Sequence, residues 1–281
     1  MSPVHDQSYR RYGGSRLPLG RGWLVILRAG VRSLLSKRVF IALLLLAWVP
    51  FLVRSVQIYA VVTYPQTAQV LPVNAGLFQN FIEFQGLFAF FVAIYAGAGL
   101  IAVDRRANAL QVYLAKPLLR IEYIAGKLGV LVVYLTAVTV APAILLLVMQ
   151  IALSGSIALI RESPSIVPAV IVASAMRVIV PAVTMLALSS LSTSARYVAL
   201  MYTGVIFFSE ALYGVLAFVT GSTGVAWVSV TRNFEVVTDA IFGRAPRYDS
   251  PPIVSMLVLL ALVTLSVSVL ERRVRGVEVV S

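Results

Sequence analysis

Six long apolar stretches constrain this chain more than any other feature of its sequence. A bilayer core about 30 Å thick requires roughly 20 mostly apolar residues per helix, and these stretches meet or approach that length. We therefore predict an all-α polytopic membrane protein, with local kinks at Pro142, Pro168 and Pro181. The predicted spans cover residues 39–62, 79–103, 128–153, 166–191, 198–220 and 253–270.

The composition excludes several other classes of protein. Of the 281 residues, 60% are hydrophobic and 12% are charged, whereas a soluble domain carries about 25% charged residues. The chain has no cysteine, and its one histidine, His5, lies in a polar amino-terminal segment. We therefore expect no metal site, no bound cofactor and no cysteine- or histidine-based catalysis in this chain.

The basic residues predict the orientation in the membrane. Arginine and lysine concentrate before the first span, in the loop 104–127 and after the last span, whereas the alternate loops hold few. Under the positive-inside rule, both termini are then cytoplasmic. Because the cationic residues lie at the membrane edge, the net charge of +12 does not indicate a nucleic-acid partner.

Outside the spans, the chain divides into short segments. We expect residues 1–18 to be a disordered basic tail, residues 19–38 to form an amphipathic helix in the cytoplasmic interface, and residues 272–281 to form a cytoplasmic tail. The six-helix transmembrane domain then covers residues 39–271.

The segment 19–38 has the pattern of an interfacial helix. Its apolar residues recur at helical spacing, while its arginines occupy another face, near anionic headgroups. The helix either only anchors the chain to the membrane or also contacts a cytoplasmic partner. The residues that define it are Trp23, Leu27, Arg28, Val31 and Arg32.

A second amphipathic stripe lies in the long outer loop 221–252. Trp227, Val230, Phe234, Val237 and Ile241 are three or four residues apart. This spacing predicts a short helix that rests on, or dips into, the outer leaflet. It serves either as a structural cap or as a lid over a pathway.

Four ionisable residues fall within the spans, where unpaired charges are costly. Arg54 and Glu83 lie at matching depth near the outer ends of consecutive spans, and Arg177 and Glu210 lie at matching depth near the middle of theirs. We predict two interhelical pairs, Arg54–Glu83 and Arg177–Glu210. For the first pair, an equally good alternative is that both side chains reach the outer interface separately.

The loop after the second span carries the most informative pattern. The span ends at Asp104-Arg105-Arg106, an amphipathic stretch with Leu110, Tyr113 and Leu114 follows, and Pro117 ends it. We predict a short helix held at the membrane surface between two spans, suited to transmit a force from a cytoplasmic protein to the spans.

This loop resembles the corresponding loop of ABC-2-type transporter permeases. Asn108-Ala109 stands where Gly-Thr is commoner in that family. The six-span topology and the two amphipathic segments also agree, so the resemblance covers most of the chain. Within the family, the chain is most similar to the multi-copper-enzyme maturation permease group. The matching positions are Asp104, Arg105, Leu110, Leu114, Pro117, Arg120, Gly126 and Lys127.

The resemblance implies a division of labour between subunits. Two six-span subunits, identical or paralogous, form a dimer in the membrane lipid, and separate ABC ATPase subunits bind ATP and Mg²⁺ below it. The loop forms a coupling helix that docks in the ATPase, and transport is expected to be export. The contacts carried over are Arg105, Arg106, Leu110, Tyr113, Leu114 and Lys116, with Pro117 and Arg120 holding the shape.

Other functional classes fit the sequence less well. The chain has no G-x-x-x-x-G-K-[ST] segment, so ATP hydrolysis is expected only in a partner. An intramembrane enzyme would need a base beside a nucleophile, and no histidine lies in a span. The serines from Ser189 to Ser194 are better explained as helix-end hydrogen bonding or as the lining of a polar cavity. A membrane anchor that recruits a complex without transport is the main alternative.

Overall fold

The computed structural model describes residues 21–109 and 119–274. Within these ranges the chain is helical, and six segments are long and apolar enough to cross a membrane, which confirms the predicted fold class. The protein is thus a multi-pass helical membrane protein. The six spans cover Arg38–Thr63, Ala75–Arg106, Arg120–Ser154, Ile166–Leu191, Ala195–Thr220 and Pro252–Arg273.

Three of the six spans consist of two helices in succession. These pairs are α2 (Arg38–Ala47) with α3 (Val49–Thr63), α4 (Ala75–Gly97) with α5 (Ala102–Arg106), and α7 (Arg120–Val138) with α8 (Val140–Ser154). The other spans are the single helices α10 (Ile166–Leu191), α11 (Ala195–Thr220) and α13 (Pro252–Arg273). Shorter elements are α1 (Gly22–Leu35), η1 (Pro65–Gln69), α9 (Ala158–Glu162), η2 (Thr223–Val228) and α12 (Val230–Ile241).

A buried glutamine on α4 compensates for two of these helix breaks. Pro142 has no N–H and cannot donate to the carbonyl of Val138, four residues earlier. The side-chain amide of Gln85 donates to that carbonyl at 2.7 Å, and also to the carbonyl of Ala47 at 3.0 Å, where α2 ends. Pro181, in contrast, lies inside the continuous helix α10.

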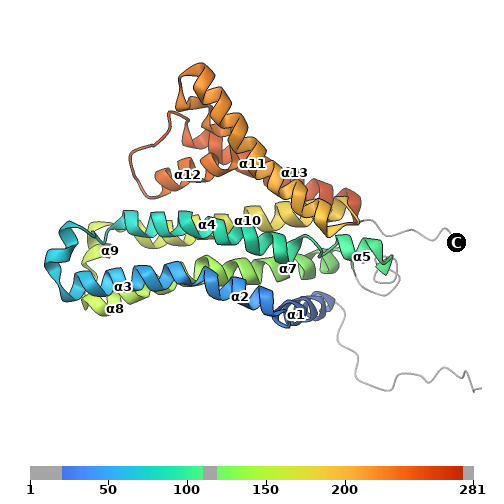
Figure 1. Cartoon of the computed structure of the whole chain (residues 1–281), viewed down its shortest axis with the longest axis horizontal. Helices are drawn as coiled ribbons and strands as arrows, with labels where there is room; N and C mark the ends of the chain where they lie inside the picture. The colour runs from blue at the N-terminus through green and yellow to red at the C-terminus, as the bar shows by residue number, and fades with distance from the viewer. Residues whose placement is uncertain (1–20, 110–118, 275–281) are drawn as a thin grey trace, which may run out of the picture.

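The spans form a long bundle from which one part diverges. Helices α2–α3, α4, α7–α8 and α10 lie along one another, while α11 rises away from them toward its end at Thr220 (Figure 1). Helix α12 lies in the resulting wedge and packs against α10 and α13, with Phe234 and Val237 in a cluster with Val180 and Leu259. Within α11 only Val198 and Tyr202 are buried, so most of its apolar surface is left to face lipid or another chain.

Helix α1 packs closely on α7. A Cβ atom at Gly126 would lie 2.9 Å from the backbone oxygen of Trp23, so only glycine allows this approach. The hydroxyl of Tyr134 donates to the Val31 carbonyl at 2.6 Å. Arg28 and Arg32 remain exposed on the other side of α1. The predicted amphipathic face therefore packs largely against protein.

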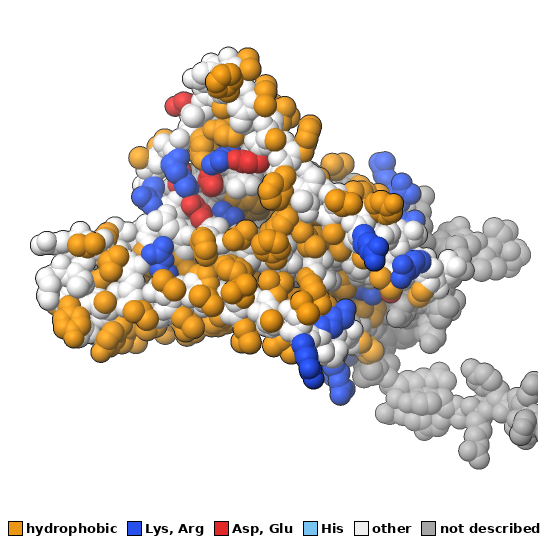
Figure 2. Space-filling view, viewed as in Figure 1, with side chains coloured by type: hydrophobic (Ala, Val, Ile, Leu, Met, Phe, Trp, Pro, Cys, Tyr) orange, Lys and Arg blue, Asp and Glu red, His pale blue; other side chains and the backbone are white. Residues whose placement is uncertain are grey.

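One end of the bundle is strongly basic. Lysine and arginine side chains gather where α1, α5 and the end of α13 lie, whereas acidic side chains gather mainly in the wedge beside α12 (Figure 2). We call the first of these the basic end.

Candidate functional site

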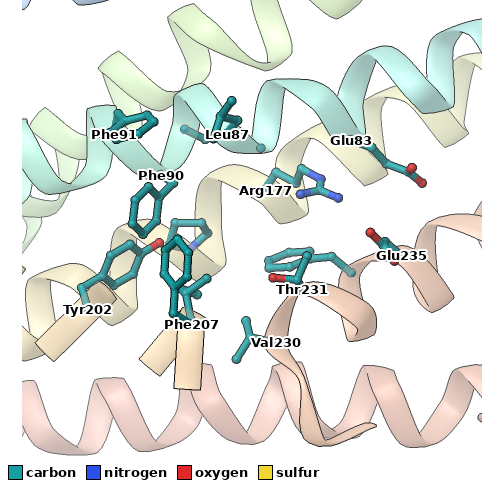
Figure 3. Close-up of a pocket in the computed structure, with 15 residues that line it drawn as sticks. Glu83, Leu87, Phe90, Phe91, Arg177, Tyr202, Phe207, Val230, Thr231 and Glu235 are labelled. Atoms are coloured by element: carbon teal, nitrogen blue, oxygen red, sulfur yellow. The ribbon is translucent and has the colours of Figure 1, made fainter. Parts of the chain in front are cut away.

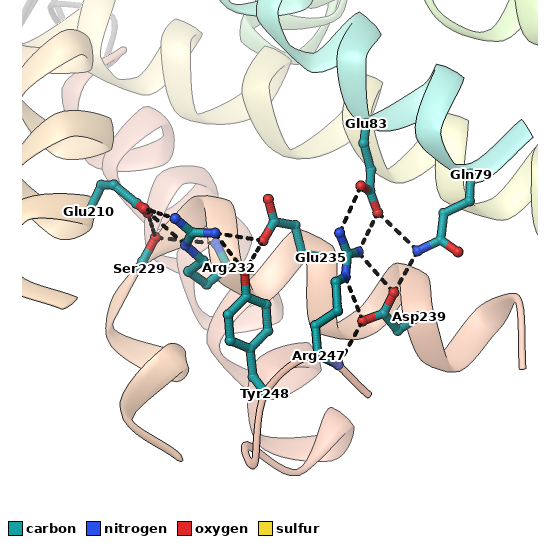
Figure 4. Close-up of polar contacts among 9 residues, drawn as sticks. All are labelled: Gln79, Glu83, Glu210, Ser229, Arg232, Glu235, Asp239, Arg247 and Tyr248. Atoms are coloured by element: carbon teal, nitrogen blue, oxygen red, sulfur yellow. Dashed lines mark hydrogen bonds and ion pairs between the residues drawn. The ribbon is translucent and has the colours of Figure 1, made fainter. Parts of the chain in front are cut away.

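A network of charged and polar side chains fills the wedge between α4, α11 and α12 (Figures 2 and 4). We call it the polar cluster. Polar groups removed from water need hydrogen-bond partners, and the members of this cluster supply them to one another. Its members are Gln79, Glu83, Glu210, Ser229, Arg232, Glu235, Asp239, Arg247 and Tyr248.

Arg247 organises one half of the polar cluster. Its guanidinium binds both oxygens of Glu83, at 3.0 and 2.5 Å, and both oxygens of Asp239, at 2.9 and 2.8 Å. The Gln79 amide also donates to both acids, to Glu83 at 3.0 Å and to Asp239 at 2.5 Å. This half ties the segment after α12 to α4.

Arg232 organises the other half. It forms an ion pair with Glu210 of α11 and another, at 3.1 Å, with Glu235. It also donates to the Tyr248 hydroxyl at 2.5 Å, and that hydroxyl donates to Glu235 at 2.6 Å. The Ser229 hydroxyl donates to Glu210 at 2.6 Å and, as the N-cap of α12, accepts from the Arg232 amide.

These contacts favour the protonated forms of Arg232, Arg247 and Tyr248. The hydrogen bonds that Arg247 donates to Glu83 and Asp239 raise its pKa, against a lowering by burial. Burial lowers the pKa of Arg232, but its bonds with Glu210 and Tyr248 raise it above the usual value. Burial, together with the bond to Glu235, raises the pKa of Tyr248 to about 12.

A cavity of about 300 Å³ opens beside the polar cluster, between α4, α10, α11 and α12 (Figure 3). One end is charged, with Arg177 facing Glu83 and Glu235. The other end is aromatic, with side chains from α4 and α11 opposite one another. The aromatic residues are Phe90, Phe91, Tyr202 and Phe207.

Arg177 lines this cavity with hydrogen-bond donors that have no acceptor in the part of the chain that the structure describes. Its side chain is buried, and its Nε has no hydrogen-bond partner among the described residues. The guanidinium lies 5.0 Å from the ring centroid of Phe234 and against Gly86, where a Cβ atom would be 2.3 Å from Nη1. An arginine with free donors in an aromatic-walled cavity is suited to bind a carboxylate or phosphate.

The two predicted intramembrane pairs do not form. Arg54 instead donates to Gln57 at 2.7 Å, because α3 lies on the side of α4 away from the wedge, while Glu83 faces Arg247. Glu210 pairs with Arg232 because α11 diverges from α10 and α12 lies between them. Arg177 accordingly faces the cavity instead of Glu210.

The predicted outer amphipathic helix is present as α12, but its environment differs from the prediction. Phe234 and Val237 are buried against α10 and α13. The polar residues Asn233 and Asp239, on other faces of α12, are buried as well. A helix buried on several sides cannot rest on a lipid leaflet. Trp227 lies outside it, in η2, and is half exposed.

The two ends of the loop 104–127 are joined directly. Lys127 forms an ion pair with Asp104 at 2.6 Å, and the Tyr123 hydroxyl donates to the same carboxylate at 2.8 Å. Arg105 donates to the Ser190 carbonyl on α10. The base of the loop is therefore fixed to both α7 and α10.

The atypical Asn108 has a conformational explanation. Its φ of +51° lies in the left-handed region, which glycine adopts freely and which asparagine tolerates best among the other residues. Asparagine can thus make this turn with less strain than most other non-glycine residues.

Some predicted loop residues lie outside the described residues. These are Leu110, Tyr113, Leu114, Lys116 and Pro117. Arg106 is exposed at the end of α5. Arg120 begins α7 and lines a second, open cavity with Glu271 and Arg272 at the basic end.

Ser189 closes the break between α4 and α5. Its hydroxyl donates to the Ala98 carbonyl at 3.0 Å and accepts from the amides of Ile101 and Ala102 at 3.0 and 3.1 Å. This is the helix-end hydrogen bonding that the sequence suggested for the serines.

Sequence reasoning missed most of the polar cluster. Of its members, the sequence pattern singled out only Glu83 and Glu210. The available signal was that the outer loop 221–252 carries both signs of charge close together. Gln85 was also missed, although a glutamine within a long apolar stretch needs polar partners.

Fold and site together define a polytopic helical membrane protein with a polar cluster and a partly enclosed cavity between its helices. No known protein-family model matches the chain, and no curated protein matches it.

Proposed function

We propose that this chain is the transmembrane permease subunit of an ATP-driven ABC transporter, an exporter in a bacterial cytoplasmic membrane. A separate ATPase subunit supplies the energy and grips the loop 104–127. A second copy or a paralogue completes the membrane unit. The proposal rests on the ABC-2-type pattern of this loop.

One structural observation carries the proposal furthest. The ion pair between Asp104 and Lys127 closes the base of the loop, and Arg105 ties that base to α10. Helix α10 also carries Arg177 into the cavity. Helix α10 therefore joins the base of the loop to the wall of the cavity, and a force applied to the loop can reach the cavity along this one helix.

Two further features support the proposal. The basic end of the molecule is the end from which the loop 104–127 leaves the bundle, and the positive-inside rule places such an end in the cytoplasm, where an ATPase would meet it. The largely unburied apolar surface of α11 is available to a second membrane subunit.

The test is purification of the chain from its native membrane without crosslinking. We expect an ATPase with Walker motifs to co-purify, and we expect its turnover to fall when Leu114 or Arg120 is changed to alanine. Arg196→Gln, a basic residue at the start of α11, is the matched control and leaves turnover unchanged. A stable complex without an ATPase would refute the proposal. An ATPase that binds but is insensitive to both alanine variants would favour the non-transporting anchor.

A further inference from the structure

The cavity beside α12 presents one group that can only donate hydrogen bonds and another that can only accept them. We propose that it binds a small zwitterion with an apolar body, its carboxylate or phosphate on Arg177 and its ammonium at Glu235. The proposal concerns binding alone and stands whether or not an ATPase drives the chain.

The donor is Arg177. This side chain is 7% exposed, and no hydrogen bond joins its guanidinium to any described residue. Gly86 gives it room, because a Cβ atom there would overlap Nη1. Since a buried donor without an acceptor costs free energy, a ligand that supplies an acceptor gains that energy on binding.

The acceptor is Glu235. Its bonds with Arg232 and Tyr248 both end on Oε2, so Oε1 makes no hydrogen bond within the described part of the chain. No ion pair joins Glu235 to Arg177, although both line the cavity (Figure 3). The other carboxylate of the cavity, Glu83, is already bound through both oxygens by Arg247. Among the charged groups that line the cavity, those with unused hydrogen-bonding atoms are thus one donor, Arg177, and one acceptor, Glu235.

The charges favour a ligand of no net charge. The arginines at and beside the cavity are Arg177, Arg232, Arg244 and Arg247, and the acids are Glu83, Glu210, Glu235 and Asp239. With Arg244, which joins the polar cluster through its bond to Gln79, the two signs are equal in number. A simple anion or cation would leave one uncompensated charge in this partly buried setting, whereas a zwitterion preserves the balance.

The aromatic end of the cavity indicates the chemistry of the uncharged part of the ligand. Phe90 stacks on Tyr202, with ring centroids 5.6 Å apart, and meets Phe207 edge-on at 6.0 Å. These walls suit an apolar or aromatic body. A volume of about 300 Å³ accommodates a molecule of the size of an aromatic amino acid, or the headgroup and first carbons of a lipid.

Equilibrium binding to the purified full chain in dodecyl maltoside tests the proposal. The probe is tritiated L-phenylalanine, and lysophosphatidylethanolamine is the lipid counterpart. We expect saturable binding of at least one of these two zwitterions. Removing either charge, as in 3-phenylpropionate or 2-phenylethylamine, is expected to weaken binding about tenfold or more. Which zwitterion binds distinguishes a free amino-acid-like ligand from a lipid headgroup.

Variants locate the site. Arg177→Gln and Glu235→Gln are each expected to weaken binding about tenfold. Gly86→Ala reports on the same site without removing a charge, because it displaces the guanidinium. Arg54→Gln, another arginine within a span, and Glu162→Gln keep wild-type affinity. Size-exclusion profiles establish that each variant is folded, and Gly86→Ala remains informative if Arg177→Gln is not.

Three results would overturn the proposal. They are the absence of saturable binding of both zwitterions to monodisperse protein, equal affinity for 3-phenylpropionate and phenylalanine, and unchanged affinity in a folded Arg177→Gln or Gly86→Ala variant. Because no ATPase is present in the assay, these results leave the proposed coupling function untouched.

Discussion

Arg247 holds Glu83 through two nitrogens, at 3.0 and 2.5 Å, and so links the segment after α12 to α4. The same guanidinium holds Asp239 at the end of α12. One side chain therefore connects the element in the wedge to α4. A substitution of Arg247 therefore removes the bonds that hold α12 to α4 and leaves the apolar core of the bundle unchanged.

We expect Arg247→Met to destabilise the protein, because Asp239 is buried and would lose its cation. Removing one partner of a buried ion pair costs about 3–5 kcal/mol, and the partial exposure of Arg247 reduces that figure. The thermal unfolding midpoint of the purified protein measures the effect. Arg161→Met, on the short helix α9, is the control. An unchanged midpoint in Arg247→Met would show that the link carries no stability.

Tyr248 is expected to make stability depend on pH in the alkaline range. Its pKa rises from 10.0 to about 12 on folding, so between pH 10 and pH 12 the unfolded chain has lost a proton that the folded chain keeps. The contribution of Tyr248 is therefore fully present below pH 10 and is lost as the pH rises toward 12. The stability difference between wild type and Tyr248→Phe should shrink across this interval. A difference independent of pH would contradict the assignment.

Gln85→Leu is expected to lower the free energy of unfolding by roughly 2 kcal/mol or more, because the carbonyls of Ala47 and Val138 lose their donor in a buried site. Gln150→Leu is the matched control. Gln150 is also buried in a span, and its Oε1, like that of Gln85, has no partner. Unlike Gln85, its side-chain amide donates to no carbonyl within the described residues, so the change should be neutral. Unfolding in a titration with dodecyl sulfate compares the two. Equal effects of the two variants would argue against the role of Gln85 at the helix breaks.

Gly126→Ala is expected to loosen α1 from α7. The added Cβ would lie 2.8 Å from the Ile26 Cβ and 2.9 Å from the Trp23 carbonyl oxygen, and overpacking of this kind costs about 1–3 kcal/mol. Trypsin should then cleave after Arg28 or Arg32 faster than in wild type. Gly204→Ala has open space around it and should leave cleavage unchanged. Equal cleavage rates in the two variants would show that α1 tolerates the methyl group.

Asp104→Asn tests the base of the loop 104–127. The change removes the ion pair with Lys127 while leaving an acceptor for Tyr123. If the loop transmits force from an ATPase, coupled ATP turnover falls several-fold while the protein stays folded. Lys127→Met should have the same effect. The double variant should lose no more than either single variant, because both remove one interaction. Additive losses would mean that the two residues act separately.

The spans were readable from the sequence because the requirement that defines them is local. A helix in lipid must be long and apolar along its own residues, so residues 166–191 were predicted with the bounds that α10 has. The same holds for the amphipathic spacing in α1 and α12. Helix-end hydrogen bonding, the role that Ser189 has in the structure, was one of the two roles that residue type and position suggested for the serines.

The partners of the charged residues depended on packing that no local pattern contains. Position along a span placed Arg177 and Glu210 near the middle of α10 and α11, as in the structure. Position along a span does not say which face of a helix a residue occupies or whether two helices diverge. Helix α11 turns away from α10, α12 enters the wedge between them, and Glu210 therefore meets Arg232. The sequence specified six spans and the side chains able to form ion pairs. The relative placement of α10, α11 and α12 selected the pairs and left Arg177 facing a cavity. The physical reason is that charge pairing acts over a few ångströms, whereas the paired residues are separated by many positions along the chain.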